Sequence, residues 1–373
     1  MAMSSNIWTR NRIVSWHIDV LDKSDQVIDE LVYTGIDPEG DPISGGVVGG
    51  SFSRSNARAV RSTGTFDILA SYNTPFPEWR DVHLRPFYRL HNPDGSIAED
   101  RPIGTYLPAV PERTYEDGSS NFSIDLYDKL LIPHRRRVTQ TYTAAQGTPV
   151  IDLAEQLLAE VGERRVAVTE TDETLRGPMS WETGTTYLQI INDLLDSINY
   201  FSLWCDGWGR YRMQPYQPPE RRPESWNFIN DSNSIYAHGW THERDEFNVP
   251  NQVILIAQPE GDDEPLTAIR TNDDPDSPYS TINVGHINPL LEEGVEATSQ
   301  RVLNDIADRR LGEVGRVTSS FNLEHWWVPL ELNDVVILRH SETGTNVRCA
   351  LQSDEFSMDL DALVSSRLRA VGS

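Results

Sequence analysis

Lysine is nearly absent from this chain of 373 residues: Lys23 and Lys129 are the only two, and arginine supplies the remaining basic charge. Acidic residues outnumber basic ones by 57 to 32, which gives a formal net charge of −25. Affinity for nucleic acid depends on cationic contacts to phosphates, so this balance argues against a protein that binds DNA through its backbone. The simplest role for such an acidic surface is solubility.

Cysteine and long apolar runs are also scarce. Cys205 and Cys349 lie far apart in two expected strands, which favours two reduced, buried thiols over a disulfide. No apolar run reaches the length needed to span a membrane, and the polar start at residues 1–10 is unlike a signal peptide. We therefore expect a protein that is made in a cytoplasm and does not insert into a membrane.

Alternation of apolar and polar residues is typical of strands over most of the chain. In residues 7–135, alternating segments are separated by turn residues, as at 22–25 and 91–96, and the glycine-rich segment 45–50 is interpreted as a bend. Short strands with frequent turns predict a barrel or a sandwich. Strand patterns return after residue 249 and continue to the C-terminus, with one expected helix at 298–311.

Helical periodicity is concentrated between residues 139 and 217. Apolar residues recur at three-to-four spacing in 150–161 and again from Leu188 to Ile198. Thr148 and Thr185 are suited to cap the starts of these two helices.

The second helix ends at Asn199 and leads into two strand-like segments, 200–205 and 211–214, around a glycine-rich turn. The pattern predicts a small α/β domain. Four prolines between 215 and 223 then mark the start of a linker.

The sequence contains no catalytic or cofactor-binding signature that we recognise. His238 and His242 stand four apart beside Glu243, but the zincin order and a third ligand are missing. Glycoside hydrolysis requires only two carboxylates, so the presence of 57 acidic residues does not discriminate for or against it. We predict no enzymatic activity, no cofactor and no metal ligands, with a hydrolase as the least favoured alternative.

Four of the ten tryptophans are candidate interaction residues: Trp204, Trp208, Trp326 and Trp327. Aromatic side chains could form a platform for a sugar, but in strands they more often belong to the core or to a subunit interface. We therefore interpret these four as possible subunit-interface aromatics.

Several short motifs resemble those of a known family. The segment 199–204, Asn-Tyr-Phe-Ser-Leu-Trp, is followed by Asp-Gly-x-Gly-x-Tyr at 206–211 and a proline-rich exit. Pro-Ile-Gly-Thr-Tyr-Leu at 102–107, Ile-Asp-Leu-Tyr-Asp-Lys-Leu at 124–130 and Val-Pro-Asn-x-Val at 249–253 complete the pattern. It is similar to that of tail hub proteins, also called minor tail proteins, of long-tailed (siphovirus) bacteriophages of the actinophage type. It is more distantly similar to the baseplate hub proteins of contractile tails.

This resemblance implies a mainly β fold in which two β-barrel domains flank a helix–hairpin α/β domain. The expected divisions are an N-terminal barrel at 1–138, the α/β domain at 139–217, a proline-rich linker at 218–248, and a second barrel with one helix at 249–373.

The resemblance also implies a function. A homotrimer with two similar barrels per chain would form a ring that adapts a sixfold tail to a threefold tip. The implied partners are a hexameric distal tail ring protein, the C-terminus of the tape measure protein, and other minor tail or fibre proteins. Genome DNA would pass through the central channel without specific binding, and an acidic wall would keep it from sticking.

The implied location is the virion tail tip, after synthesis and assembly in the cytoplasm of the host bacterium. A receptor- or carbohydrate-binding module at the same tip is the alternative.

Overall fold

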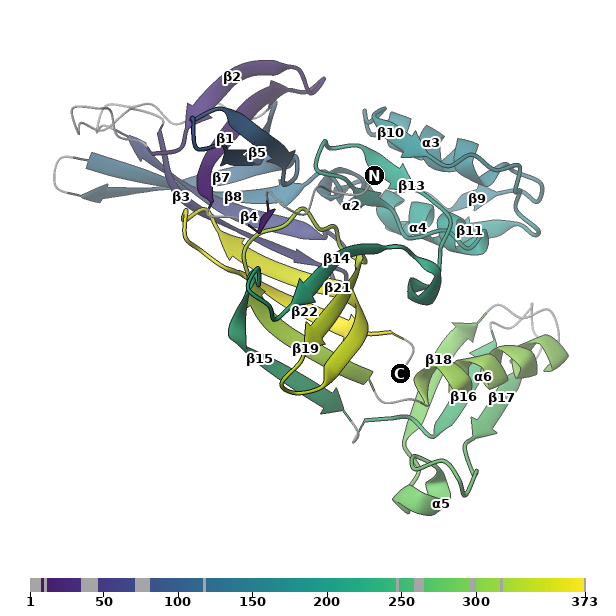
Figure 1. Ribbon diagram of the computed structural model, residues 1–373. Coiled ribbons are helices and arrows are strands. Elements are labelled where there is room, and N and C mark those ends of the chain that lie inside the picture. Colours follow the sequence, from purple (N-terminus) through teal and green to yellow (C-terminus); the bar gives the residue numbers. More distant parts are fainter. Residues whose placement is uncertain are drawn as a thin grey trace. The chain divides into compact units, whose positions relative to one another are not determined.

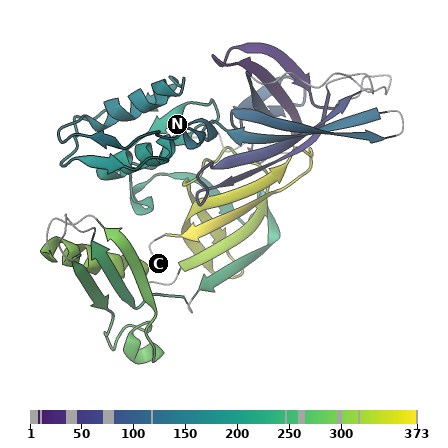
Figure 2. The ribbon, with the colours of Figure 1, turned by 180° about the vertical axis from the view of Figure 1, so that it is seen from behind.

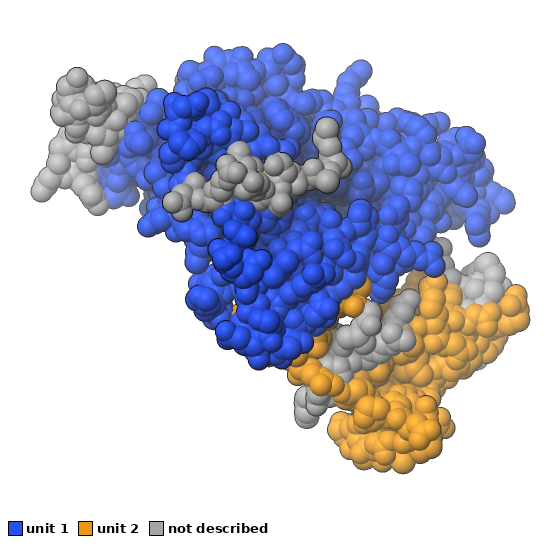
Figure 3. Space-filling model, viewed as in Figure 1, with its two compact units in different colours: residues 1–239, 323–368 blue, residues 240–322, 369–373 orange. Residues whose placement is uncertain are grey.

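A computed structural model describes residues 8–9, 12–34, 46–70, 81–116, 119–245, 248–257, 265–295, 300–315 and 318–371 (Figure 1). The chain forms two compact units (Figure 3): unit 1 comprises residues 1–239 and 323–368, and unit 2 comprises residues 240–322 and 369–373. Strands account for 49% and helices for 15% of the structure. The chain is therefore mainly β with an α/β insert, as predicted.

The N-terminal part of unit 1 is an antiparallel sheet. Its strands are β1 (Ile13–Asp22), β2 (Val27–Val32), β3 (Gly46–Ser55), β4 (Ser62–Ala70), β5 (Val82–His91), β6 (Ile97–Pro102), β7 (Tyr106–Glu116) and β8 (Ser119–Asp128). They follow the order β3-β4-β8-β7-β5-β1-β2, with β6 paired to β5. Alternation places large aromatic side chains on one face: Trp16 stacks on Phe52 at a ring-centroid distance of 6.0 Å and meets the edge of Tyr88 at 5.4 Å.

The C-terminal strands extend this same sheet. They are β14 (Glu224–Ile229), β15 (Tyr236–Asp245), β19 (Thr318–His325), β20 (Val335–His340), β21 (Thr345–Ser357) and β22 (Val364–Ala370). The 13-residue strand β21 pairs with β20 through its first half and with β3 through Ser353–Ser357. Figure 2 shows the last of these strands, in yellow, beside the N-terminal ones. The two sets of strands thus share one continuous ladder.

The expected linker at 218–248 is wrong in its extent. The short 3-10 helix η1 (Pro219–Arg221) lies among the prolines, and β14 and β15 then enter the sheet. The structure also differs over 249–373, because β16 to β18 and two helices belong to unit 2 while β19 to β22 belong mostly to the large sheet. The physical reason is long-range pairing: β14 lies parallel to β20, a partner more than 100 residues away.

The α/β insert comprises α2 (Leu131–Arg135), β9 (Tyr142–Ala144), α3 (Val150–Glu160), β10 (Val166–Val168), β11 (Met179–Trp181), α4 (Tyr187–Ser197), β12 (Trp204–Cys205) and β13 (Tyr211–Met213). The helices α3 and α4 contribute to one buried apolar cluster. Thr186, rather than Thr185, caps α4 by accepting a hydrogen bond from the Gln189 amide, and Asn199 ends it with a φ of 58°. Thr148 does not cap α3, which starts after Pro149 without a side-chain cap.

Unit 2 contains a three-stranded sheet and two helices. The elements are β16 (Gln252–Ala257), β17 (Thr267–Thr271), α5 (Thr281–Val284), β18 (Pro289–Val295) and α6 (Gln300–Val314). The strand order is β17-β16-β18, and α6 covers one face through Leu303 and Ala307. None of the helices in the described parts of the chain is both long and apolar enough to cross a membrane.

Candidate interaction surfaces and the junction with the insert

The turn between β12 and β13 presses against the large sheet. Asp206 shapes the turn, because its Oδ1 accepts hydrogen bonds from the backbone amides of Trp208 and Arg210, each at 3.1 Å. Gly209 has a φ of 72°, and a Cβ on Gly207 would lie 2.5 Å from the Pro102 carbonyl oxygen. The two glycines are therefore required by the turn conformation and by its close approach to the end of β6.

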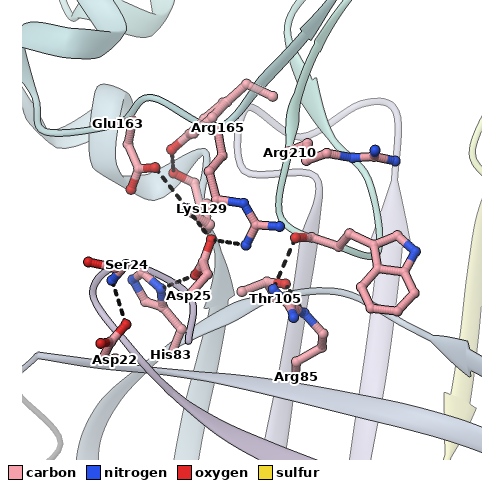
Figure 4. A network of polar contacts seen from close by, with 12 residues as sticks. Asp22, Ser24, Asp25, His83, Arg85, Thr105, Lys129, Glu163, Arg165 and Arg210 are labelled. Atoms are coloured by element: carbon pink, nitrogen blue, oxygen red, sulfur yellow. Dashed lines mark hydrogen bonds and ion pairs between the residues drawn. The ribbon is translucent and has the colours of Figure 1, made fainter. Parts of the chain in front are cut away.

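Trp208 stands at the tip of this turn and is 45% exposed. Its ring meets Phe87 at a centroid distance of 5.7 Å and an angle of 72°. The Arg85 guanidinium lies 5.5 Å from the ring centroid, and its Nη2 donates to the Trp208 carbonyl at 3.0 Å (Figure 4). The indole is held by the protein and still presents nearly half of its surface.

A buried ionic network joins the sheet to the insert (Figure 4). Asp25, in the β1–β2 turn with a φ of 58°, is only 7% exposed. His83 Nδ1 lies 2.8 Å from its Oδ1, while Arg165 Nη1 at 2.6 Å and Lys129 Nζ at 3.2 Å approach its Oδ2. Lys129 Nζ also lies 2.8 Å from Glu163 Oε2.

The charges of this network oppose the effect of burial on Asp25. Burial alone raises the pKa of its carboxyl group. The hydrogen bond from His83, the charge of Lys129 and the hydrogen bond from Arg165 outweigh that effect and hold the pKa well below its usual range. The carboxylate is thus ionised, and the β1–β2 turn is tied to the segment between α3 and β10.

A cavity of about 240 Å³ lies where the insert meets the sheet within unit 1. Its lining includes Trp204 and Cys205 from β12, Arg61 and Asp128 from the sheet, and the loop 331–334 before β20. Burial raises the pKa of Asp128 to about 7, although the backbone amides of Ser62 and Leu130 donate to its carboxyl group and lower it in part. The lining combines apolar side chains with both acidic and basic groups.

The four tryptophans fall into two pairs by position in the chain: Trp204 and Trp208 on the β12–β13 hairpin, and Trp326 and Trp327 between β19 and β20. Trp204 lines the cavity, with the Arg212 guanidinium 5.8 Å from its ring centroid. Trp327 is 5% exposed and stacks on Tyr88 at 4.5 Å, while the Arg12 guanidinium lies 5.7 Å from the ring of Trp326.

The two pairs do not form one sugar platform. Trp208 contacts Phe87 and Trp327 contacts Tyr88. Phe87 and Tyr88 are neighbours on β5, and successive side chains of a strand point to opposite faces. A subunit-interface role stays a prediction for the exposed Trp208, whereas Trp327 has little surface left to offer.

Unit 2 has an apolar surface that the tryptophan pattern did not indicate. Ile254 on β16 pairs in register with Ile269 on β17 and with Leu291 on β18, so the three side chains share one face of the sheet. The residues that pack under α6, including Val253 and Leu255, lie on the other face. Ile269 and Leu291 are each 53% exposed. We call Ile254, Ile269 and Leu291 the isoleucine–leucine row.

A signal for this row was present in the sequence. Residues 253–256, Val-Ile-Leu-Ile, are apolar without alternation, a pattern typical of strands with apolar groups on both faces. An apolar patch on an exposed sheet face is characteristic of a surface that binds another protein.

The sequence matches no protein-family model and no curated protein. The fold, in contrast, is similar to those of solved phage tail proteins. A tail protein from Neisseria meningitidis MC58 has a TM-score of 0.65 at 15% identity, with 95% of this chain and 96% of that chain covered. The 43 kDa tail protein of prophage MuSo2 from Shewanella oneidensis gives 0.61 at 12% identity, covering 95% and 98%.

Two further structures have related folds. The prophage tail protein gp18 from Listeria monocytogenes EGD-e gives a TM-score of 0.54 at 12% identity, covering 95% and 94%. A type VI secretion component of E. coli, itself similar in structure to the bacteriophage T4 tail proteins gp27 and gp5, gives 0.50 at 9% identity, covering 87% and 73%. The chain therefore has a tail-hub-like fold, as the sequence motifs predicted. At these identities the similarity establishes the fold.

Proposed function

We propose that this protein is a structural hub at the tip of a phage tail, of the siphovirus and actinophage type that the sequence motifs resemble. The observation that carries the proposal is the similarity in fold to the Neisseria tail protein, which covers 95% of this chain and 96% of that one. A match over both full lengths supports a shared arrangement of the whole chain.

The proposed assembly is a homotrimer around the tail channel. The N-terminal strands β1–β8 and the C-terminal strands of the large sheet would act as the two barrel modules of each chain. Three copies then present six similar modules, which suits contact with a hexameric distal tail ring on one side and a threefold tip on the other. The role is assembly and DNA passage without bond chemistry, alongside the tape measure C-terminus and other minor tail or fibre proteins.

The isoleucine–leucine row is our candidate for a subunit contact. Two of its side chains, Ile269 and Leu291, are more than half exposed and would gain from burial by a partner. Exposed apolar side chains of this kind dominate the centres of subunit interfaces, while charged groups are depleted there.

The test is the mass of the purified chain in solution, measured by light scattering after gel filtration. We expect a species of three 42.2 kDa chains. Ile269→Glu or Leu291→Glu should shift it to the monomer, whereas Leu360→Glu, at a loop residue that is 47% exposed, should not. A wild-type monomer over the whole concentration range would overturn the trimer, and a trimer in both row variants would place the contact elsewhere.

A receptor- or carbohydrate-binding module is the second candidate, and the half-exposed Trp208 is the observation that favours it. Stacking on a sugar requires an accessible aromatic ring, and this residue is 45% exposed. Sedimentation of the isolated chain with host cell walls, abolished by Trp208→Ala, would support this alternative. A wild-type chain that stays in the supernatant would exclude it.

A further inference from the structure

Three potential metal ligands meet on the β1–β2 hairpin. His17 and Asp19 are two residues apart on β1, so their side chains point to the same face. Asp19 pairs in register with Glu30 on β2. One ligand atom from each of the three, an imidazole nitrogen and two carboxylate oxygens, lies within 4.8 Å of the other two. No sequence motif indicated this group, because Glu30 comes from a different strand.

Asp19 is the central member of this group. It is 9% exposed, and its hydrogen bond and ion pair within the described residues both go to His17, whose Nε2 lies 2.6 Å from its Oδ1. Arg85, its neighbour on β5, donates instead to Thr105 Oγ1 and to the Trp208 carbonyl. The Arg85 charge reaches Asp19 through space, but among the described residues no hydrogen bond from outside the group reaches this buried carboxylate.

Without a bound cation, the facing carboxylates of Asp19 and Glu30 repel each other. Like charges at directly opposite positions of an antiparallel pair destabilise the sheet. The repulsion is stronger here because Asp19 is largely removed from water. Among the described residues, Glu30 forms no ion pair that would offset it. A bound cation would turn this repulsion into attraction.

We propose that His17, Asp19 and Glu30 form a binding site for a divalent transition-metal ion such as Zn²⁺ or Mn²⁺. The imidazole suits zinc and the carboxylates suit manganese, so the mixed set accepts ions of this class. The His17 ring already packs on Phe87, with ring centroids 5.7 Å apart. Glu30 is exposed, so water would complete the coordination. Because β2 ends the strand path of the sheet, the ion would clamp an edge strand to its only neighbour on that path.

The test uses the full chain stripped of metal with EDTA and titrated calorimetrically with Zn²⁺ and, separately, with Mn²⁺. We expect one site per chain for at least one ion and a higher melting temperature in its presence. Glu30→Gln and His17→Gln should each weaken that site by about tenfold or more, since removing even an outer partner of a metal ligand has an effect of this size. Asp125→Asn is the matched control: Asp125 is an exposed carboxylate on β8, outside the group.

The outcomes distinguish binding at the proposed site from non-specific attraction of cations to an acidic protein. The proposal is overturned if neither ion binds, if either ligand variant binds like the wild type, or if Asp125→Asn weakens binding as much as Glu30→Gln does. Without metal, Glu30→Gln should melt no lower than the wild type, because the substitution removes the repulsion between the facing carboxylates. Weaker binding in a variant that is no less stable without metal shows that it lost the ion and kept the fold. The result is independent of the trimer, because binding is counted per chain.

Discussion

Replacing Lys129 by methionine is the sharpest test of how the insert is held on the sheet. The ammonium group of Lys129 lies between Asp25 and Glu163, at 3.2 and 2.8 Å, and its side chain is 2% exposed. Methionine keeps most of the length and packing of the stem, and it removes the ammonium group that lies 5.7 Å from the Tyr211 ring centroid. The substitution therefore removes a charge and little else.

The expected loss follows from the partners left behind. Breaking a buried ion pair by removing one member costs about 3–5 kcal/mol. Asp25 keeps His83 and Arg165, but Glu163, 8% exposed, loses the ion pair that it forms within the described part of the chain. We expect a decrease of about 3 kcal/mol in the free energy of unfolding, at the low end of that range.

Urea unfolding followed by tryptophan fluorescence measures this loss. Lys23→Met is the matched control, because the other lysine of the chain is exposed in the β1–β2 turn, and it should change stability by less than about 0.5 kcal/mol. Adding Glu163→Gln to Lys129→Met should recover at least about 1 kcal/mol by removing the unpaired charge. A Lys129→Met protein within about 1 kcal/mol of the wild type, or no recovery in the double variant, would refute the reasoning.

Three further outcomes follow from other buried groups. Burial lowers the pKa of His325 to about 4. The imidazole of the unfolded chain protonates near its ordinary value, so the free energy of unfolding should fall as pH drops from about 6.5 to 4. His325→Gln should flatten that part of a pH series of urea melts. Gly207→Ala should lower stability by about 1–3 kcal/mol in the same assay, since its Cβ would meet the Pro102 carbonyl, and an unchanged midpoint would contradict the close approach. Cys349 is buried and forms no disulfide, so a thiol reagent should label it only in denaturant.

Local signals were sufficient to predict the α/β insert. The apolar periodicity in 150–161 and 188–198 gave both helices to within a few residues, and Asn199 ends the second one as expected. These elements have neighbours close in sequence, so spacing and cap residues carry most of the information. The cap predicted for α4 was wrong by one residue because either threonine in Thr185–Thr186 satisfies the pattern. The cap predicted for α3 was wrong because that helix starts after Pro149 without a side-chain cap.

Pairing between distant segments could not be read from the sequence. The bend expected at 45–50 is wrong, since residues 46–50 belong to β3. A Cβ on Gly50 would lie 2.6 Å from the Thr65 carbonyl oxygen, so this glycine marks close packing between strands. The same limitation explains the linker, where the prolines stop before β14 but its parallel partner β20 is distant.

The candidate surfaces were partly foreseen. Trp208 was selected and is exposed, but the isoleucine–leucine row and the group around Asp19 depend on register between strands. A one-residue shift in register would send each of these side chains to the other face. Sites assembled across strands are therefore visible only once the pairing is known.

Because some arginine residues are buried, they affect how the excess of acidic residues acts at the surface. Arg54 and Arg85 are buried, and Arg54 donates to Asp354 at 2.8 Å and to the Leu330 carbonyl. An arginine paired in this way adds little to the outer field, so the net charge of −25 acts mainly through exposed carboxylates. At physiological salt such charges act over about 8 Å. They can therefore repel a passing DNA duplex only where they line the channel closely, whereas their effect on solubility needs no particular location. These charges act over a longer distance at lower salt. Repulsion of DNA from a channel wall would therefore increase as salt is lowered, whereas the effect of the charges on solubility requires no such dependence.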